Sequence, residues 1–226
     1  MALPKAWLSW SSGKDSAWSL EVMREQGEFE IKALLTTVNS EHQRVAMHAV
    51  RESLLRAQAE SVGLPLVTVP IPSPCPNDVY EEAMAQAMRK ALEEGITHII
   101  FGDLFLEDIR KYREAKLAGS GIQPRFPLWG LDTHQLAREM VQAGLRAVLT
   151  CVDPKKLDAA FAGRRFDAEL LAELPAEIDP CGENGEFHTF AYAGPMFQAP
   201  LEVEGGIVLE RDGFVFADVA PKSSDV

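Results

Sequence analysis

The 226-residue sequence has few cysteines, a deficit of basic side chains and no apolar stretch at its start long enough to span a membrane. Its three cysteines, Cys75, Cys151 and Cys181, show no metal-ligand spacing and no disulfide framework, which indicates a reducing compartment. The 22 basic and 34 acidic residues give a net charge of −12, which disfavours nonspecific binding to nucleic acid. Residues 1–10 contain no small-residue cleavage site, so we expect a cytoplasmic protein without a membrane segment.

Internal repeats and low-complexity segments are absent as well, and the length suits one large or two small domains. The first part of the chain instead alternates short apolar runs with helical patterns. Such βαβ alternation predicts a parallel sheet with right-handed crossovers. The expected strands are 6–10, 31–38, 64–71 and 97–103, and the expected helices are 16–26, 48–63, with Gly63 as its C-cap, and 78–95.

The composition changes at about residue 119. Residues 119–130 are rich in glycine and proline and are interpreted as a linker or an ordered loop. A helix, a strand, short helical pieces and a β-rich tail follow, which indicates an α+β domain. We therefore expect two domains, one over 1–120 and a smaller one over 121–226. The expected elements of the second domain are a helix at 132–143 and strands at 145–152, 201–210 and 213–219.

The junction between the first strand and the first helix has the sequence SSGKDS, residues 11–16. It is not a Walker A loop, because Leu8 stands where the first glycine belongs and Asp15 where Ser or Thr belongs. The dinucleotide fingerprint G-x-G-x-x-G is absent too. Small residues and a lysine at a helix N-terminus still favour a phosphate site, although a simple helix cap is the alternative.

In this loop Ser11, Ser12 and Ser16 offer hydroxyl groups, and Gly13 allows close approach of the backbone. Lys14 adds a positive charge. Asp15 could orient the loop or bind Mg²⁺.

The loop resembles the S-G-G-K-D-S loop of PP-loop ATP pyrophosphatases, with Ser12 in place of the first glycine. The segments 36–51, 102–114, 126–130 and 179–197 resemble the diphthine–ammonia ligase family, also called the diphthamide synthase family, and its bacterial members in particular. The resemblance covers nearly the whole chain. It implies an α/β fold like that of the adenine nucleotide α-hydrolases, with a Rossmann-like sheet of five parallel strands and a smaller C-terminal α+β domain.

The resemblance also implies a reaction. ATP and Mg²⁺ would activate a carboxylate to an acyl-adenylate with release of pyrophosphate, and ammonia would convert the adenylate to an amide with release of AMP. The carboxylate is either a small molecule or part of a protein. The form of residues 181–190 resembles the bacterial branch, for which a carboxylate other than diphthine is expected.

Further candidate residues follow other strand ends, where parallel sheets bind ligands. The resemblance to PP-loop proteins implies that Thr36 and Thr37 contact adenine or ribose, and Met47 and His48 would line the same pocket. A strand end with ordinary polar residues is the alternative. Gly102 and Asp103 follow a buried strand, and the Asp103 carboxylate suits Mg²⁺ or a ribose hydroxyl.

The segment after Asp103 has the spacing of an amphipathic helix. Its periodicity predicts that Phe105, Ile109 and Tyr112 form the buried face. The opposite, charged side would carry Asp103, Glu107, Arg110 and Glu114. Arg110 and Arg113 are interpreted as contacts to phosphate or to the substrate carboxylate, and Glu107 as a further substrate contact. A solvated, salt-bridged face is the alternative.

The segment CGENGEFHTF, residues 181–190, concentrates an acid, an amide and an imidazole next to two glycines. Asn184 and Glu186 are candidates for binding or orienting ammonia, Glu183 for substrate binding, and His188 for proton transfer. A polar surface hairpin is the alternative. Cys181 has no identifiable partner and is expected to be an inert buried thiol.

Two other functions remain open on the sequence. A PP-loop enzyme acting on tRNA is opposed by the net charge of −12 and by the lack of a cysteine pair. A nucleotide-binding protein without turnover is the second alternative. Association into a homodimer is a further expectation.

Overall fold

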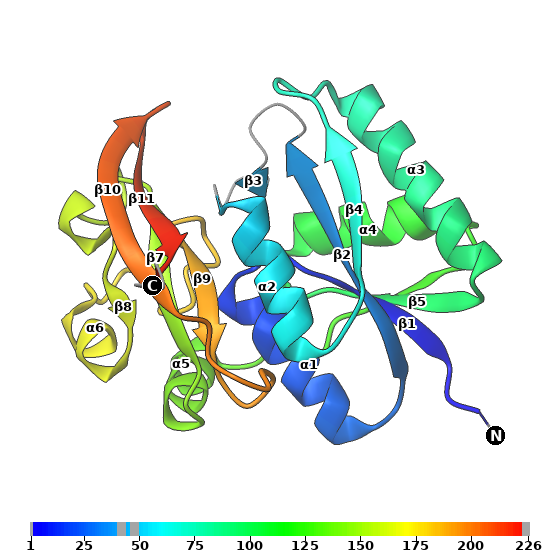
Figure 1. Cartoon of the computed structure of the whole chain (residues 1–226), viewed down its shortest axis with the longest axis horizontal. Coiled ribbons are helices and arrows are strands. Elements are labelled where there is room, and N and C mark those ends of the chain that lie inside the picture. Colours follow the sequence, from blue (N-terminus) through cyan, green and yellow to red (C-terminus); the bar gives the residue numbers. More distant parts are fainter. Residues whose placement is uncertain (1, 40–43, 46–49, 223–226) are drawn as a thin grey trace.

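The computed structural model describes residues 2–39, 44–45 and 50–222, which form two β-sheets with flanking helices (Figure 1). The first sheet contains five parallel strands in the order β4-β2-β1-β5-β6, and the two-residue strand β3 pairs antiparallel with the end of β2. The strands are β1 (Lys5–Ser9), β2 (Glu30–Asn39), β3 (Arg44–Val45), β4 (Leu66–Ile71), β5 (Ile96–Ile100) and β6 (Gln123–Arg125).

Strand β1 occupies the centre of this sheet because its side chains are apolar and both faces of the sheet are covered. The chain moves from β1 to β2 on one side and later reaches β5 on the other side, so the strand order reverses between β1 and β5. Ligands of such open α/β sheets bind at the carboxyl ends of the strands at this reversal.

Helices cover the two faces of the first sheet in pairs. Helices α1 (Lys14–Gln26) and α2 (Glu52–Val62) pack on one face, and α3 (Asn77–Glu93) and α4 (Glu107–Leu117) lie on the other. Gly63 ends α2 in the left-handed conformation at φ 71°, as expected of a C-cap glycine. No helix within the described ranges has the length and apolarity needed to cross a lipid bilayer.

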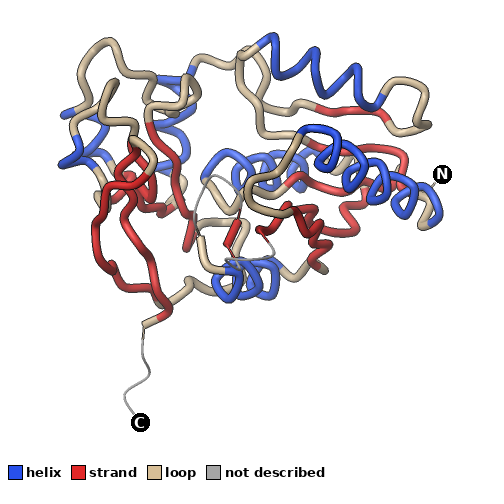
Figure 2. Tube along the Cα trace, turned by 90° about the horizontal axis from the view of Figure 1, so that it is seen from above, coloured by secondary structure: helices blue, strands red, loops and turns tan. Residues whose placement is uncertain are grey.

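The second sheet is antiparallel and is built around β7. Strand β9 pairs with one edge of β7, and β8 and β11 pair with the other, while β10 pairs with β11. In Figure 2 the strands of the two sheets form two separate groups. The elements are α5 (Thr133–Gln142), β7 (Arg146–Val152), the 3₁₀ helix η1 (Ala159–Phe161), β8 (Arg165–Phe166), α6 (Ala168–Glu173), β9 (Phe187–Ala193), β10 (Val203–Arg211) and β11 (Phe214–Pro221).

A single hydrophobic core joins the two sheets. It includes Leu8 of β1, Leu20 of α1, Leu55 of α2, Phe166 of β8 and Phe190 of β9, all of them buried. Because the core is continuous, the second sheet packs against the face of the first sheet that carries α1 and α2. The carboxyl end of β1 therefore faces the second sheet.

The expectation of a linker at 119–130 is wrong in one respect, because residues 123–125 form β6. This strand pairs in parallel with β5, with His98 opposite Gln123. The N–H of Phe101 also donates to the Arg125 carbonyl at 2.8 Å. A three-residue strand that contains Pro124 has almost no local signal, since its position depends on pairing with β5.

The predicted buried face of α4 is also wrong. Phe105, Ile109 and Tyr112 are 37%, 37% and 40% exposed, while Leu117 is buried. Arg113 is half-buried instead, next to Phe101 and Asp103. Helical periodicity identifies an apolar stripe, but it does not establish that the stripe faces the core of the same chain.

Candidate functional site

The loop between β1 and α1 begins with two hydrogen bonds to β2. The N–H of Trp10 donates to the Leu35 carbonyl at 2.8 Å, and the Thr36 hydroxyl donates to the Trp10 carbonyl at 2.7 Å. Thr36 is buried and Thr37 is half-buried. Thr36 therefore anchors the loop, and the neighbouring Thr37 points to the opposite face of the strand.

Ser12 adopts a left-handed backbone conformation at φ 69°, which glycine adopts much more easily. Its carbonyl accepts hydrogen bonds from the N–H of Ala191 and from Nε2 of Gln58, both at 2.9 Å. Its hydroxyl is buried and has no hydrogen-bond partner in the described part of the chain. The replacement of glycine in the loop motif therefore has a conformational consequence.

Gln58 of α2 connects this loop to the second sheet, and the sequence analysis missed it. Its side-chain oxygen accepts from Trp10 Nε1 at 2.8 Å, and its Nε2 donates to the carbonyls of Ser12 at 2.9 Å and Ala191 at 2.5 Å. The residue is fully buried. The available signal was its position between Leu54 and Val62, four residues from each, on the apolar face of α2.

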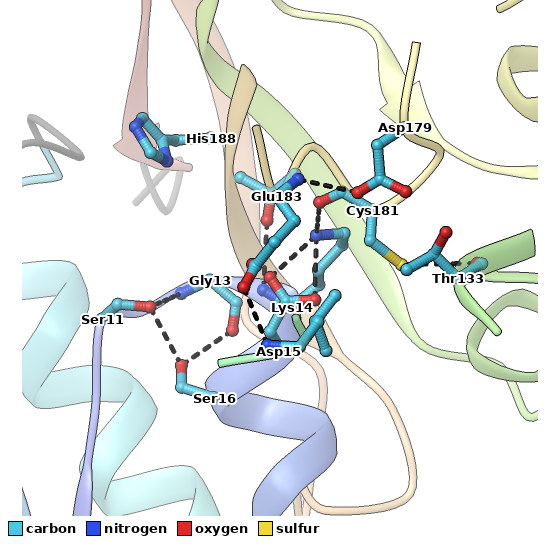
Figure 3. A network of polar contacts seen from close by, with 12 residues as sticks. Ser11, Gly13, Lys14, Asp15, Ser16, Thr133, Asp179, Cys181, Glu183 and His188 are labelled. Carbon is cyan, nitrogen blue, oxygen red and sulfur yellow. Dashed lines mark hydrogen bonds and ion pairs between the residues drawn. The ribbon is translucent and has the colours of Figure 1, made fainter. Parts of the chain in front are cut away.

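Lys14, the first residue of α1, is buried at the meeting point of the two sheets (Figure 3). Its backbone N–H donates to the Thr189 hydroxyl of β9 at 3.1 Å. Its Nζ bonds both carboxylate oxygens of Asp15, at 2.8 and 3.0 Å, and also the Cys181 carbonyl. Burial alone would lower the pKa of Lys14, but Asp15, with a contribution from Glu183, holds it above its ordinary value, so the side chain stays positively charged.

Three further residues of the loop hold one another in place. The Ser11 and Ser16 hydroxyls lie 3.2 Å apart, and the Ser16 hydroxyl also donates to the Gly13 carbonyl at 2.9 Å. The Gly13 N–H donates to the Ser11 hydroxyl at 3.3 Å. These bonds hold the turn that leads from β1 into α1.

The end of β5 approaches α1 so closely that a Cβ at position 102 would need the backbone of α1 to shift by a few tenths of an ångström. A Cβ on Gly102 would lie 3.1 Å from the backbone carbonyl of Asp15 and 3.2 Å from the nitrogen of Ser16. Asp103 follows and pairs with Arg113, with Nε 2.6 Å from Oδ2. The Arg113 guanidinium also stacks on the Phe101 ring at 4.4 Å.

Asp15 and Asp103, the two residues predicted to bind a metal, are therefore each paired with a cation. Within the described ranges no group of three or more His, Cys, Asp or Glu side chains is arranged to hold a metal ion. Mg²⁺ often takes only one or two carboxylates and completes its coordination with phosphate oxygens and water. Two carboxylates that line one cavity are the kind of donor set that such a site uses.

Glu183 reaches from the loop before β9 to the end of β5. Its Oε1 accepts from the Leu104 N–H at 2.7 Å, and its own N–H donates to Asp179 Oδ2 at 2.8 Å. Burial raises the pKa of Glu183 to about 7; Asp15 and Asp103 add to this rise, and the Leu104 hydrogen bond and Lys14 oppose it. Its carboxyl group can therefore exchange a proton near neutrality.

Glu186 lies inside this loop, and Asn184 is exposed and bonds to it. Glu186 is buried, and its Oε1 accepts from the Asp179 N–H at 3.1 Å and from Asn184 Nδ2 at 3.2 Å. Lys156 Nζ donates to the Asn184 carbonyl at 2.6 Å. The contacts of these two predicted catalytic residues hold the loop that carries Glu183.

A cavity of about 250 Å³ lies at the carboxyl ends of β1 and β5. It brings together many of the residues predicted from sequence, whereas Ser12, Gly13, Thr36, Thr37, Asn184 and Glu186 are not among its lining residues. The lining residues are Ser9, Ser11, Lys14, Asp15, Ser16, Gly102, Asp103, Arg113, Cys181, Gly182, Glu183, Phe187, His188 and Thr189.

His188 stands apart from the Lys14 network in Figure 3 but lines the same cavity. Burial, with a contribution from the nearby Lys14, lowers the pKa of His188 to about 4. Its imidazole is therefore neutral at pH 7. Cys181 is buried, its Sγ lies 3.5 Å from the Thr133 carbonyl, and burial raises the pKa of its thiol. These properties agree with the expected inert thiol.

Arg110 and Glu107 lie outside the cavity. Arg110 Nε bonds Glu114 at 2.8 Å, and its guanidinium lies over the rings of Phe126, at 5.0 Å, and Trp129, at 4.7 Å. Glu107 is exposed and pairs with Lys111 at 2.8 Å. The segment with Met47 and His48 lies outside the described residues.

Comparison with known proteins identifies the family. Residues 5–124 match the model of the diphthamide synthase N-terminal domain, and residues 132–216 match that of the C-terminal domain. The diphthine–ammonia ligase of Bos taurus is 25% identical over 233 residues, covering 93% of this chain and 86% of that protein. The Danio rerio diphthine–ammonia ligase is 28% identical over 178 residues, covering 71% and 69%. The chain belongs to the diphthamide synthase family.

Proposed function

We propose that this protein is an ATP-dependent amide-forming ligase that adenylates a carboxylate and transfers the acyl group to ammonia. One observation carries the proposal. Lys14 at the N-terminus of α1 and the protonatable carboxyl group of Glu183 line the same cavity, at the point where the strand order reverses. Family membership supports it, since the related proteins are named diphthine–ammonia ligases. Residues 1–120 bind ATP in this proposal, and residues 121–226 handle the acyl group and the amine.

The N-terminus of α1 is the proposed site for the ATP phosphates. The first turn of a helix has N–H groups without intrahelical partners, and the helix dipole favours an anion there. Lys14 adds a buried positive charge. Its Nζ is now held by Asp15 and Cys181, so a phosphate would have to compete for, or share, the Lys14 ammonium group.

Asp15 and Asp103 are the residues that we propose to hold Mg²⁺ together with phosphate oxygens. Both line the cavity at the end of the loop. When bound, the ion would neutralise negative charge on the phosphates.

The first chemical step is proposed to occur at the α-phosphorus. A substrate carboxylate oxygen forms a bond to this phosphorus, the bond to the β-phosphate oxygen breaks, and pyrophosphate leaves. Lys14 and the α1 N-terminus would stabilise the negative charge that develops on the leaving group. Arg113 is the cavity arginine that could pair with the incoming carboxylate in place of Asp103.

The second step needs ammonia with its lone pair free, whereas ammonium predominates in neutral solution. Glu183 is proposed to take the proton, because its pKa of about 7 lets it be ionised at working pH and protonated afterwards. Nitrogen then bonds the acyl carbon, AMP leaves with the bonding electrons, and the extra proton passes to a base. The neutral His188 is the second cavity residue able to accept it.

Asn184 and Glu186 contribute indirectly in this scheme, by holding the loop that carries Glu183.

Diphthine is the first acyl substrate to test because of the related proteins' names, and a small free acid is the second. Nothing in the described geometry favours tRNA modification, and the net charge of −12 argues against it. Two copies of the chain are also proposed to associate, through the surface described in the next subsection.

The decisive experiment combines the purified chain with ATP, Mg²⁺, ammonium and a panel of acids that includes a diphthine-bearing protein. Chromatography of the adenine products and a pyrophosphate assay would follow the reaction. We expect AMP and pyrophosphate in the presence of the correct acid. ADP and orthophosphate as the primary products would contradict the proposed cleavage between the α and β phosphates.

Lys14→Ala tests the binding site itself by calorimetry with ATP. A charged hydrogen bond contributes about 1.5–3 kcal/mol, so we expect ATP affinity to fall about 10- to 100-fold. Lys32→Ala is the control, since Lys32 is on the exposed surface of β2. Equal affinities for the two variants would show that Lys14 does not bind phosphate.

A further inference from the structure

Helix α4 carries an apolar stripe that the described part of the chain covers only in part. Phe105 precedes the helix, and Ile109 and Tyr112 follow at helical spacing, each more than a third exposed. A surface helix normally turns such a stripe towards its own core. The large exposed side chains instead resemble the centre of a protein interface.

The stripe borders a groove between α3 and α4. The groove has a volume of about 590 Å³ and an apolar floor formed by Leu35, Ile99 and Phe101. Met84 and Met88 form its α3 wall, and Tyr112 belongs to both the stripe and the groove. Leu92 of α3 also lines the groove and is 41% exposed, which extends the apolar surface along the other helix.

Two opposite charges on this face of α4, Asp108 and Lys116, lie at equal distances on either side of Tyr112. Asp108, Tyr112 and Lys116 stand four residues apart and form one row along the helix. Asp108 and Lys116 therefore lie about 6 Å to either side of Tyr112 along the axis, given a rise of about 1.5 Å per residue. Asp108 is exposed, and Lys116 is held over the Tyr112 ring by an ion pair with Glu81 at 2.7 Å.

We propose that two copies of this chain associate through the α3–α4 face, with their α4 helices packed antiparallel about a two-fold axis at Tyr112. A two-fold rotation at Tyr112 brings Asp108 of each copy opposite Lys116 of the other. The acidic first turn of one helix then faces the basic last turn of its partner. The same rotation brings the two apolar stripes together and covers both grooves.

Sedimentation velocity of the full chain over a range of concentrations tests the association. We expect the wild type to reach twice the monomer mass of 24.9 kDa. Tyr112→Asp places two like charges on the axis and should weaken the dimer at least tenfold, without changing the melting temperature of the monomer. A wild type that stays monomeric up to about 100 μM, the weak end of specific association, would overturn the proposal.

Charge reversal tests the antiparallel geometry. Asp108→Lys and Lys116→Glu should each weaken the dimer about tenfold, because each creates two like-charge contacts. A mixture of the two variants should form heterodimers with both contacts restored, seen by native mass spectrometry. Glu30→Lys and Lys32→Glu are the matched controls, since this exposed ion pair is on β2, outside α3 and α4, and should leave the dimer intact.

The mixing result decides between this arrangement and others. A dimer that ignores both row variants, or that weakens without recovering on mixing, would contradict pairing of α4 with α4. These measurements use mass alone, so their outcome is independent of whether the proposed ligase reaction occurs.

Discussion

Replacing Gln58 by leucine should destabilise the protein substantially, although no residue of the cavity is touched. The change keeps the side chain's approximate volume and removes its three hydrogen bonds to Trp10, Ser12 and Ala191. Trp10 Nε1 would then be a buried donor without its acceptor, at a cost of about 1–3 kcal/mol. The Ser12 carbonyl keeps its hydrogen bond from the Ala191 N–H, so the loss of its bond from Gln58 should cost less free energy than the loss at Trp10.

We therefore expect the free energy of unfolding to fall by about 2–4 kcal/mol, dominated by the buried Trp10 donor. Urea denaturation followed by tryptophan fluorescence measures it. Because one hydrophobic core joins the two sheets, a single transition is expected.

The matched control is Gln86→Leu, because Gln86 bonds Glu82 on the exposed surface of α3. A surface change of this kind should shift stability by no more than about 0.5 kcal/mol. Equal stabilities of the two variants would refute the view that Gln58 ties the loop to the second sheet. A calorimetric titration adds a second readout, since loosening of the Ser12 carbonyl should also weaken ATP binding.

Two further predictions concern the loop and the cavity. Ser12→Gly should raise the free energy of unfolding by about 1 kcal/mol. The change relieves the left-handed backbone strain and removes a buried hydroxyl group, and these gains exceed the entropic cost of glycine. A fall in melting temperature would contradict this. The pKa of about 7 for Glu183 makes the folded state bind more protons than the unfolded state between about pH 4.5 and 7, so this group lowers stability as pH rises. The pKa of about 4 for His188 has the opposite effect between about pH 4 and 6.5, so these two contributions oppose each other there. Each effect amounts to about 3 kcal/mol at most. In Glu183→Gln the His188 effect remains, so urea denaturation should show stability increasing with pH. In His188→Gln the Glu183 effect remains, so stability should decrease with pH. Identical pH profiles for the two variants would show that these groups do not titrate as described.

Much of the architecture follows from local patterns in the sequence. Apolar runs separated by helical periodicity predicted β1, β2, β4 and β5, and Gly63 ends α2 as expected. The SSGKDS junction predicted a site at the first strand end, and the cavity there includes Lys14 and Asp15. These features depend on residues within a few positions of one another, so the sequence displays them directly.

Features that depend on distant residues were missed or interpreted differently. Gln58 looks like any polar residue in α2 until Trp10 and Ala191 are brought to it. Glu186 and His188 lie two residues apart, yet Glu186 holds its own loop while His188 lines the cavity. The side of a strand or loop that meets a ligand is set by packing against other elements, which alternation alone does not specify.

The sequence by itself determined the order of the elements, the parallel character of the first sheet and the place of the lysine loop, because periodicity and helix-end chemistry are local. Only the tertiary structure decided that β9 completes this loop, through the hydrogen bond from Lys14 to Thr189, 175 residues away. It also decided that α4 exposes its apolar stripe. Both outcomes depend on how one continuous core positions the two sheets, and packing of that kind is a property of the whole chain.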